Sequence, residues 1–186
     1  RRAFSWSFGG LAGLRWPAMA IKNDCFLRAC RREPVPHTPV WMMRQAGRYM
    51  AEYRKLREKH SMLTVCKTPE LALEVTKQPL RLGVDAAILF ADILLPIEPM
   101  GAPFEFAKGE GPVVHTPIAS RAQIDALRVI EPGEGLGYVM DAIRLIKKEI
   151  DVPLIGFAGA PFTLASYLVE GGKSAHFVKT KRLMYE

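Results

Sequence analysis

The chain has 186 residues, of which 49% are hydrophobic and 24% charged, an ordinary globular composition with enough apolar residues for one sizeable core. No uninterrupted apolar run approaches the roughly 18 residues of a membrane-spanning helix, so we expect no membrane partner. The formal net charge is +7, but residues 1–23 alone contribute +4, and the remaining chain has no block of Lys and Arg with interleaved aromatic residues. We therefore expect no nucleic-acid partner either.

The first residues differ in composition from the rest of the chain. Residues 1–18 are rich in Arg, Ser, Gly and Trp and contain no acidic residue, a composition typical of organellar targeting peptides. The stretch that begins at Met19 resembles the natural start of a reading frame. We interpret residues 1–18 as a non-native upstream extension or a targeting-like, disordered tail. Residues 19–186 are expected to belong to one domain.

The cysteines and histidines follow no recognised ligand spacing. The cysteines are odd in number and form no CxxC pair, and the histidines show no HExxH spacing: Cys25, Cys30 and Cys66; His37, His60, His115 and His176. The spacing predicts neither a disulfide framework nor a zinc site. Three reduced thiols are typical of a cytosolic protein.

Apolar periodicity and terminal signals predict alternating helices and strands. In chain order these are a helix over 23–31, a strand over 40–43, helices over 50–59 and 68–83, a strand over 85–90, a helix over 137–150, a strand over 152–157 and a helix over 161–169. Thr68 is the expected N-cap of the helix that ends at Gly83, and Pro79 should kink or split that helix. Between the second and third strands, the Gly- and Pro-rich residues 96–117 predict a long excursion in which a hairpin is one option.

This order of elements is that of a parallel α/β domain. The strands are short continuous apolar runs, which is typical of strands covered on both faces. A (β/α)₈ barrel needs eight strands and typically about 250 residues, so three strands would be only part of one. A doubly wound sheet is the alternative, but no strand is followed by the GxGxxG fingerprint.

Polar residues follow each predicted strand, at the edge where parallel α/β folds bind ligands. Arg44 and Arg48 come after the first strand, with Gly47 allowing close backbone approach. Asp92 lies two residues past the second strand, among apolar neighbours, and Tyr167 lies on the helix after the third. Guanidinium groups indicate an anionic ligand, and a lone carboxylate in an apolar cleft suits a cationic intermediate. The alternatives are surface ion pairs for the arginines, a cap or turn role for the aspartate and core packing for the tyrosine.

Several of these segments, in this order, closely resemble the uroporphyrinogen decarboxylase family. They include PVWMMRQAGRY at 39–49, DAAILFADIL at 85–94 and YLVEGG at 167–172, together with residues 76–82, 109–112, 136–138 and 152–161. One departure is Ala91, where the family commonly has serine. The resemblance covers nearly everything after residue 20. In these segments the sequence resembles bacterial rather than animal members of the family.

The resemblance implies a (β/α)₈ barrel, usually a homodimer, that needs no cofactor and no metal. It implies decarboxylation of the four acetate side chains of uroporphyrinogen III to give coproporphyrinogen III in haem and other tetrapyrrole synthesis. Asp92 matches the aspartate that binds the pyrrole N–H groups and stabilises the protonated pyrrole, and Tyr167 matches a substrate-contacting tyrosine. Binding of the substrate carboxylates is implied for the segment Arg44, Gln45, Ala46, Gly47 and Arg48.

The resemblance also indicates what this chain does not include. The family's later serine and histidine contacts would lie beyond Glu186, so residues 19–186 match the N-terminal part of one barrel domain, truncated at the C-terminus. We expect the polypeptide alone to be inactive and poorly soluble, because an open half-barrel exposes apolar edges and faces. Two alternatives remain: a zinc-dependent barrel methyltransferase of the corrinoid or thiol type, which a tightly bound zinc would favour, and a non-catalytic tetrapyrrole-binding fragment.

Overall fold

The structure is a computed structural model that describes residues 21–42, 47, 49–107 and 111–185. The helices of the described residues are α1 (Cys25–Cys30), α2 (Ala51–Lys59), α3 (Met62–Lys67), α4 (Pro69–Lys77), α5 (Arg121–Asp125), α6 (Pro132–Gly135), α7 (Gly137–Glu149), α8 (Pro161–Glu170) and α9 (Val178–Tyr185), with 3₁₀ helices η1 (Gln78–Leu82) and η2 (Leu95–Ile97). The strands are β1 (Ala87–Ile88), β2 (Phe104–Ala107), β3 (Gly111–Val114) and β4 (Leu154–Ile155).

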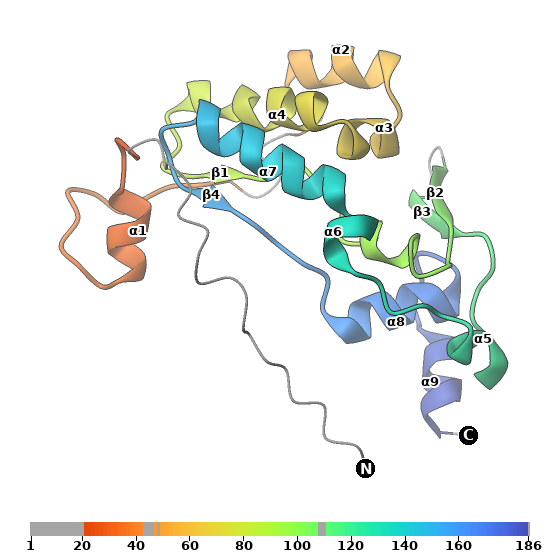
Figure 1. Cartoon of the computed structure of the whole chain (residues 1–186). Coiled ribbons are helices and arrows are strands. Elements are labelled where there is room, and N and C mark those ends of the chain that lie inside the picture. The colour runs from red at the N-terminus through yellow and green to blue at the C-terminus, as the bar shows by residue number, and fades with distance from the viewer. Residues whose placement is uncertain (1–20, 43–46, 48, 108–110, 186) are drawn as a thin grey trace.

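The centre of the fold is a parallel pair, β1 and β4. Ala87 lies opposite Leu154 in this pair, and Ala87 N–H donates to the Pro153 carbonyl at 2.9 Å. A crossover that includes α7 connects the two strands, and α4 and α7 pack side by side along them (Figure 1). Ala72 of α4 and Ile146 of α7 are fully buried in the cluster between the helices and the strands. This helix-covered parallel pairing is the local geometry of an α/β barrel.

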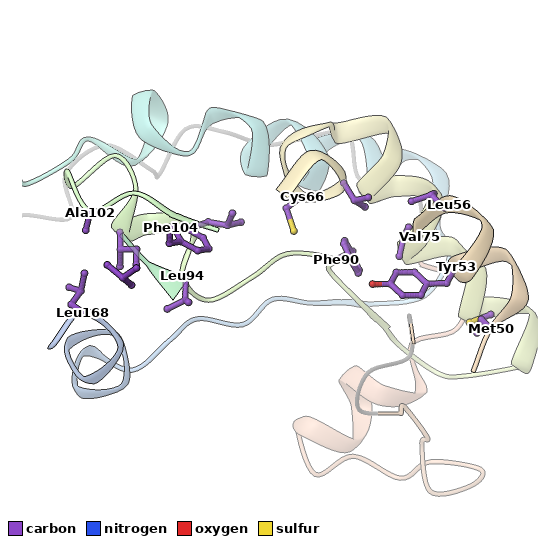
Figure 2. Close-up of a cluster of buried hydrophobic side chains, with 14 of the residues drawn as sticks. Met50, Tyr53, Leu56, Cys66, Val75, Phe90, Leu94, Ala102, Phe104 and Leu168 are labelled. Carbon is purple, nitrogen blue, oxygen red and sulfur yellow. The ribbon is translucent and has the colours of Figure 1, made fainter. Parts of the chain in front are cut away.

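A second and larger apolar cluster lies around the segment that follows β1 (Figure 2). It joins side chains of α2, α3 and α4 to the β2–β3 hairpin and to α8. Phe90 and Leu94 belong to this cluster, and the ring of Tyr53 from α2 lies 5.8 Å from the ring of Phe90. The segment after β1 is therefore held between helices that precede it and elements that follow it.

Most of the predicted elements are confirmed, including the break in a helix at Pro79 and the end of that helix at Gly83. The predicted helix over 68–83 divides into α4 and η1, because Pro79 cannot continue the α-helical hydrogen bonds. Gly83 ends η1 in the left-handed conformation, with φ of 76°. Thr68 occupies the N-cap position, although its side chain makes no capping hydrogen bond. The excursion over 96–117 contains the antiparallel β2–β3 hairpin.

The predicted strand over 40–43 is wrong for its described part, residues 40–42. Val40, Trp41 and Met42 lie outside any strand and are 53%, 39% and 43% exposed. The reason is that the Val40 N–H donates to the Asp85 carboxylate at 2.7 Å, while the Val40 carbonyl accepts the Asp85 N–H at 2.7 Å. A side chain thus takes a hydrogen bond that a strand ladder would use. Met43 lies outside the described residues.

The third predicted strand is shorter than its apolar run. Only Leu154–Ile155 pair with β1, and Phe157 is 46% exposed. Two parallel strands are therefore present in the described part of the chain where the sequence predicts three. An apolar run indicates burial but does not fix where backbone pairing ends.

Candidate active site

Phe90 is the anchor that fixes the carboxyl end of β1. Its N–H donates to the Thr76 hydroxyl of α4 at 3.0 Å, in a fully buried hydrogen bond. Its ring packs against Tyr53 of α2, as Figure 2 shows. Because two different helices hold this residue, the position of Asp92, two residues further along, is fixed by packing rather than by the loop alone.

Asp92 is half-buried at this edge and has an unusual electrostatic environment. Its Oδ1 accepts the Leu94 N–H at 2.8 Å, which makes it a turn residue as well as a candidate functional group. Burial raises the pKa of the Asp92 carboxyl above its ordinary value, and the Leu94 N–H only partly opposes this effect. Within the described residues Asp92 has no ion-pair partner. Its negative charge is therefore uncompensated by the described part of the chain.

Cys66 of α3 lies close enough for the charge of Asp92 to affect the pKa of its thiol. Its thiol is buried, and burial raises its pKa to about 12, with the charge of Asp92 as the second cause. Such a thiol stays protonated at neutral pH and is not a nucleophile. Cys66 therefore adds no charge beside Asp92, although the positive charges of Arg57 and Lys67 also act on this thiol.

The segment after β4 lies against the segment after β1. A Cβ placed on Gly159 would lie 3.2 Å from Cβ of Ile93 and 2.7 Å from Cδ2 of Leu164. The two carboxyl-end segments are therefore in contact beside Asp92. The α8 helix begins directly afterwards at Pro161 and carries Tyr167, which is partly buried against the same apolar cluster as Leu94.

The structure brings two of the predicted site residues to one region and leaves others outside what it describes. Asp92 and Tyr167 both border the large apolar cluster at the carboxyl end of the β1–β4 pair. Gly47 is partly exposed, and its carbonyl accepts the N–H of Met50 at 3.0 Å. The remaining predicted residues of this segment lie outside the described residues: Arg44, Gln45, Ala46 and Arg48.

Comparison with known proteins assigns the family. The family model described as uroporphyrinogen decarboxylase (URO-D) matches residues 21–186. The chain belongs to the uroporphyrinogen decarboxylase family. A uroporphyrinogen decarboxylase of Sorangium cellulosum is 75% identical over 165 residues, and that of Carboxydothermus hydrogenoformans is 61% identical over 167 residues. Each alignment covers 88% of this chain but only 47% and 48% of the relative, so the chain spans about half the length of the curated relatives it matches.

The fold of this family is a (β/α)₈ barrel, and a solved structure has a similar fold over most of this chain. A methyltransferase from Methanosarcina mazei superposes with a TM-score of 0.62 at 24% identity, over 81% of this chain and 46% of that one. The β1–β4 pair with its covering helices is part of such a barrel. Asp92 therefore lies at the carboxyl end of a barrel strand, where active sites of barrel enzymes are built. Among the described residues, no helix has both the length and the apolar composition needed to cross a membrane.

One group of chemically active side chains is missing from the sequence predictions. Cys25, His37 and Asp85 converge in space, although they lie 12 and 48 residues apart along the chain. This group lies at the amino-terminal end of β1, opposite Asp92. No spacing rule could have found it, because each ligand atom comes from a different loop or helix.

Proposed function

We propose that this chain contributes the substrate-binding arginines and the key aspartate of a uroporphyrinogen decarboxylase. The reaction removes carbon dioxide from the four acetate side chains of uroporphyrinogen III and leaves methyl groups. The observation that carries the proposal is the position of Asp92: a half-buried carboxylate at the carboxyl end of a barrel strand, in a chain of this family. Homologues with this name support the reaction class.

The chemistry needs a temporary acceptor for the electrons of the broken bond. Protonation of a pyrrole ring makes it cationic, so the electron pair of the C–C bond can move toward the ring as carbon dioxide leaves. A proton then replaces the lost carboxyl group, and the ring gives up its extra proton. A carboxylate near the pyrrole nitrogen atoms stabilises the cation, and it does so most strongly in a site from which water is excluded. The burial that raises the pKa of Asp92 supports this role.

The substrate is a polycarboxylate, so cationic side chains should surround it. Arg44 and Arg48 are proposed as the residues that bind its carboxylates bidentately, with residues 45–47 approaching through the backbone. Tyr167 is proposed as a contact from α8. In this assignment the arginines determine binding and Asp92 determines the rate of bond breaking. We also propose that the complete enzyme is a cytoplasmic homodimer.

A hybrid enzyme tests the proposal directly. Residues 21–186 would replace the matching half of the Sorangium cellulosum relative, which is 75% identical over the aligned region. We expect this hybrid to convert uroporphyrinogen III to coproporphyrinogen III under anaerobic conditions, with products separated by chromatography. The unmodified Sorangium enzyme is the positive control. A folded hybrid that binds the substrate but releases no carbon dioxide would overturn the proposal.

A further inference from the structure

Three potential metal ligands meet at the amino-terminal end of β1. The Sγ atom of Cys25, the Nε2 atom of His37 and a carboxylate oxygen of Asp85 all lie within 4.8 Å of one another. Sγ lies 3.9 Å from Nε2, and Nε2 lies 3.1 Å from Oδ1. Within the described ranges, no other group of three such side chains comes this close.

The geometry argues against a nucleophile–histidine–acid relay. In such a relay the nucleophile and the acid contact opposite nitrogen atoms of the imidazole, so that a proton passes through the ring. Here both Cys25 and Asp85 face the same nitrogen, Nε2 of His37. Three atoms that converge on a common point suit coordination of one ion.

The donor set and its spacing favour zinc. Thiolate, imidazole and carboxylate are all zinc ligands, with bond lengths of about 2.3, 2.0–2.1 and 2.0–2.2 Å. Tetrahedral bonds of these lengths place neighbouring ligand atoms roughly 3.3–3.6 Å apart. The observed separations of 3.9 and 3.1 Å lie close to this range. The third pair, Sγ of Cys25 and a carboxylate oxygen of Asp85, lies within 4.8 Å, so the thiol would move toward the carboxylate to complete the site.

Hydrogen bonds around the carboxylate provide the outer support that metal ligands usually have. The Val40 N–H donates to Oδ2 of Asp85 at 2.7 Å, and Nδ2 of Asn23 donates to Oδ1 at 2.9 Å. The Oδ1 atom of Asn23 in turn accepts the Cys25 N–H at 3.1 Å. Asn23 thus orients two of the three ligands at once.

Burial divides the group into a fixed part and an open part. Cys25 and Asp85 are each 4% exposed, so their positions are set by packing. The side chain of His37 is 56% exposed, which gives an ion a path from solvent and leaves room for a water as fourth ligand.

We propose that Cys25, His37 and Asp85 bind one Zn²⁺ ion, with water as the fourth ligand. Binding releases the thiol proton of Cys25 to solvent. The ion would fasten residues 23–40 to the start of β1, beside the point where the N–H groups of Lys22 and Asn23 donate to the Asp151 carbonyl. This site is independent of the proposed decarboxylation, since it lies at the opposite end of β1 from Asp92. The site also differs from the catalytic zinc site of a barrel methyltransferase, which would lie at the carboxyl ends of the strands.

Cobalt(II) is the direct probe, because a thiolate ligand gives its complex a charge-transfer absorption band. We expect the metal-free 186-residue chain to bind one equivalent of Co²⁺ with this band and to lose the band when one equivalent of Zn²⁺ is added. Cys25→Ser and His37→Gln should abolish it. Cys30→Ser and His115→Gln are matched controls that change an exposed cysteine and an exposed histidine, and they should retain it.

His37→Gln is the decisive variant, because an exposed side chain can be changed without disturbing the core. Asn23→Ala adds an independent test, since loss of an outer-shell partner should weaken Zn²⁺ binding about 10–100-fold. Zn²⁺ should raise the melting temperature of the unmodified chain and of both controls, but not of His37→Gln. A cobalt band that survives in His37→Gln, or one that disappears in Cys30→Ser, would overturn the proposal.

Discussion

Asp85 and Asp92 stand at the two ends of the same short strand, β1, yet their surroundings are opposite. Asp85 is almost fully buried and accepts hydrogen bonds from the Val40 N–H and the Asn23 side chain, while His37 lies 3.1 Å away. The Val40 N–H is the main reason that the pKa of Asp85 is lowered. Asp92 accepts one backbone N–H, and burial raises its pKa. Several donors of the fold hold the first carboxylate, whereas the second accepts a single backbone donor.

The difference between the two carboxylates follows from how the fold holds each end of β1 in place. At the amino-terminal end the chain has to attach residues 21–40, which contribute only Cys25 to the buried apolar residues of the fold. A buried carboxylate with several donors provides that attachment. At the carboxyl end the packing of Phe90 already fixes the backbone. The carboxylate there contributes one turn hydrogen bond, and its burial agrees with the role in catalysis that we propose for it.

The largest expected effect tests the role of Asp92 in turnover. In the hybrid enzyme, Asp92→Asn removes the negative charge while keeping an oxygen that can accept the Leu94 N–H. We expect kcat to fall about 10²–10³-fold, as for other residues that stabilise transition-state charge, with KM little changed. Steady-state kinetics with uroporphyrinogen III would measure both parameters.

Two comparison variants make this prediction specific. Arg44→Ala should mainly raise KM, because a carboxylate-binding residue acts on the bound substrate and the transition state alike. Asp125→Asn alters an exposed aspartate on α5 that pairs with Arg121 and should leave both parameters unchanged. If Asp92→Asn weakened binding as much as turnover, the assigned division of roles would be incorrect.

The second prediction tests the structural role of Asp85. Asp85→Ala leaves the buried donors around it without their acceptor, so the free energy of unfolding should fall by on the order of 3 kcal/mol. Asp92→Ala removes a turn hydrogen bond worth about 1 kcal/mol together with a buried charge, so its net cost should be at most about 1 kcal/mol. Urea unfolding of the two variants with a chelator present would compare the hydrogen bonds alone. Equal losses would remove the distinction between the two ends of β1.

The contact between the two carboxyl-end segments gives a third prediction. A methyl group at Gly159 would meet Ile93 at 3.2 Å and Leu164 at 2.7 Å, and the Ile93 Cβ cannot move without its backbone. Gly159→Ala should therefore destabilise the chain by about 1–3 kcal/mol. Gly156→Ala is the matched control, because nothing lies within 4 Å of a Cβ at that position. Thermal unfolding would detect the difference, and equal melting temperatures would show that the segments are not held together.

The sequence predicts the carboxyl end of β1 better than the amino-terminal end. Asp92 is recognisable because it follows directly after an apolar run, and local order along the chain is enough to place it at the ligand-binding edge. The Cys25–His37–Asp85 group depends on contacts between residues up to 60 positions apart, which no local pattern contains. The strand predicted over 40–43 is wrong at residues 40–42 for the same reason. The segment is apolar, as a buried strand would be, but the Val40 N–H donates to the Asp85 side chain instead of to a neighbouring strand.

The smallest expected effect concerns the pH dependence of stability at Asp92. Because burial raises the folded-state pKa of this carboxyl, the folded chain holds its proton more tightly than the unfolded chain does. Stability contributed by this group is therefore present at pH values below the ordinary aspartate pKa and is lost as the pH rises through the raised folded-state value. Asp92→Asn removes this loss, so the variant should melt slightly higher than the unmodified chain at neutral pH.

That gain should shrink as the pH falls, because both proteins are then uncharged at position 92. Melting temperatures of the two chains, measured from neutral pH down to below the ordinary aspartate pKa, would give the dependence, with Asp125→Asn as a surface control. A variant that is less stable than the unmodified chain at every pH would mean that the carboxylate supports the fold after all. A gain at neutral pH alone would mean that the fold carries a charge it does not need, which is the condition expected of a residue kept for catalysis.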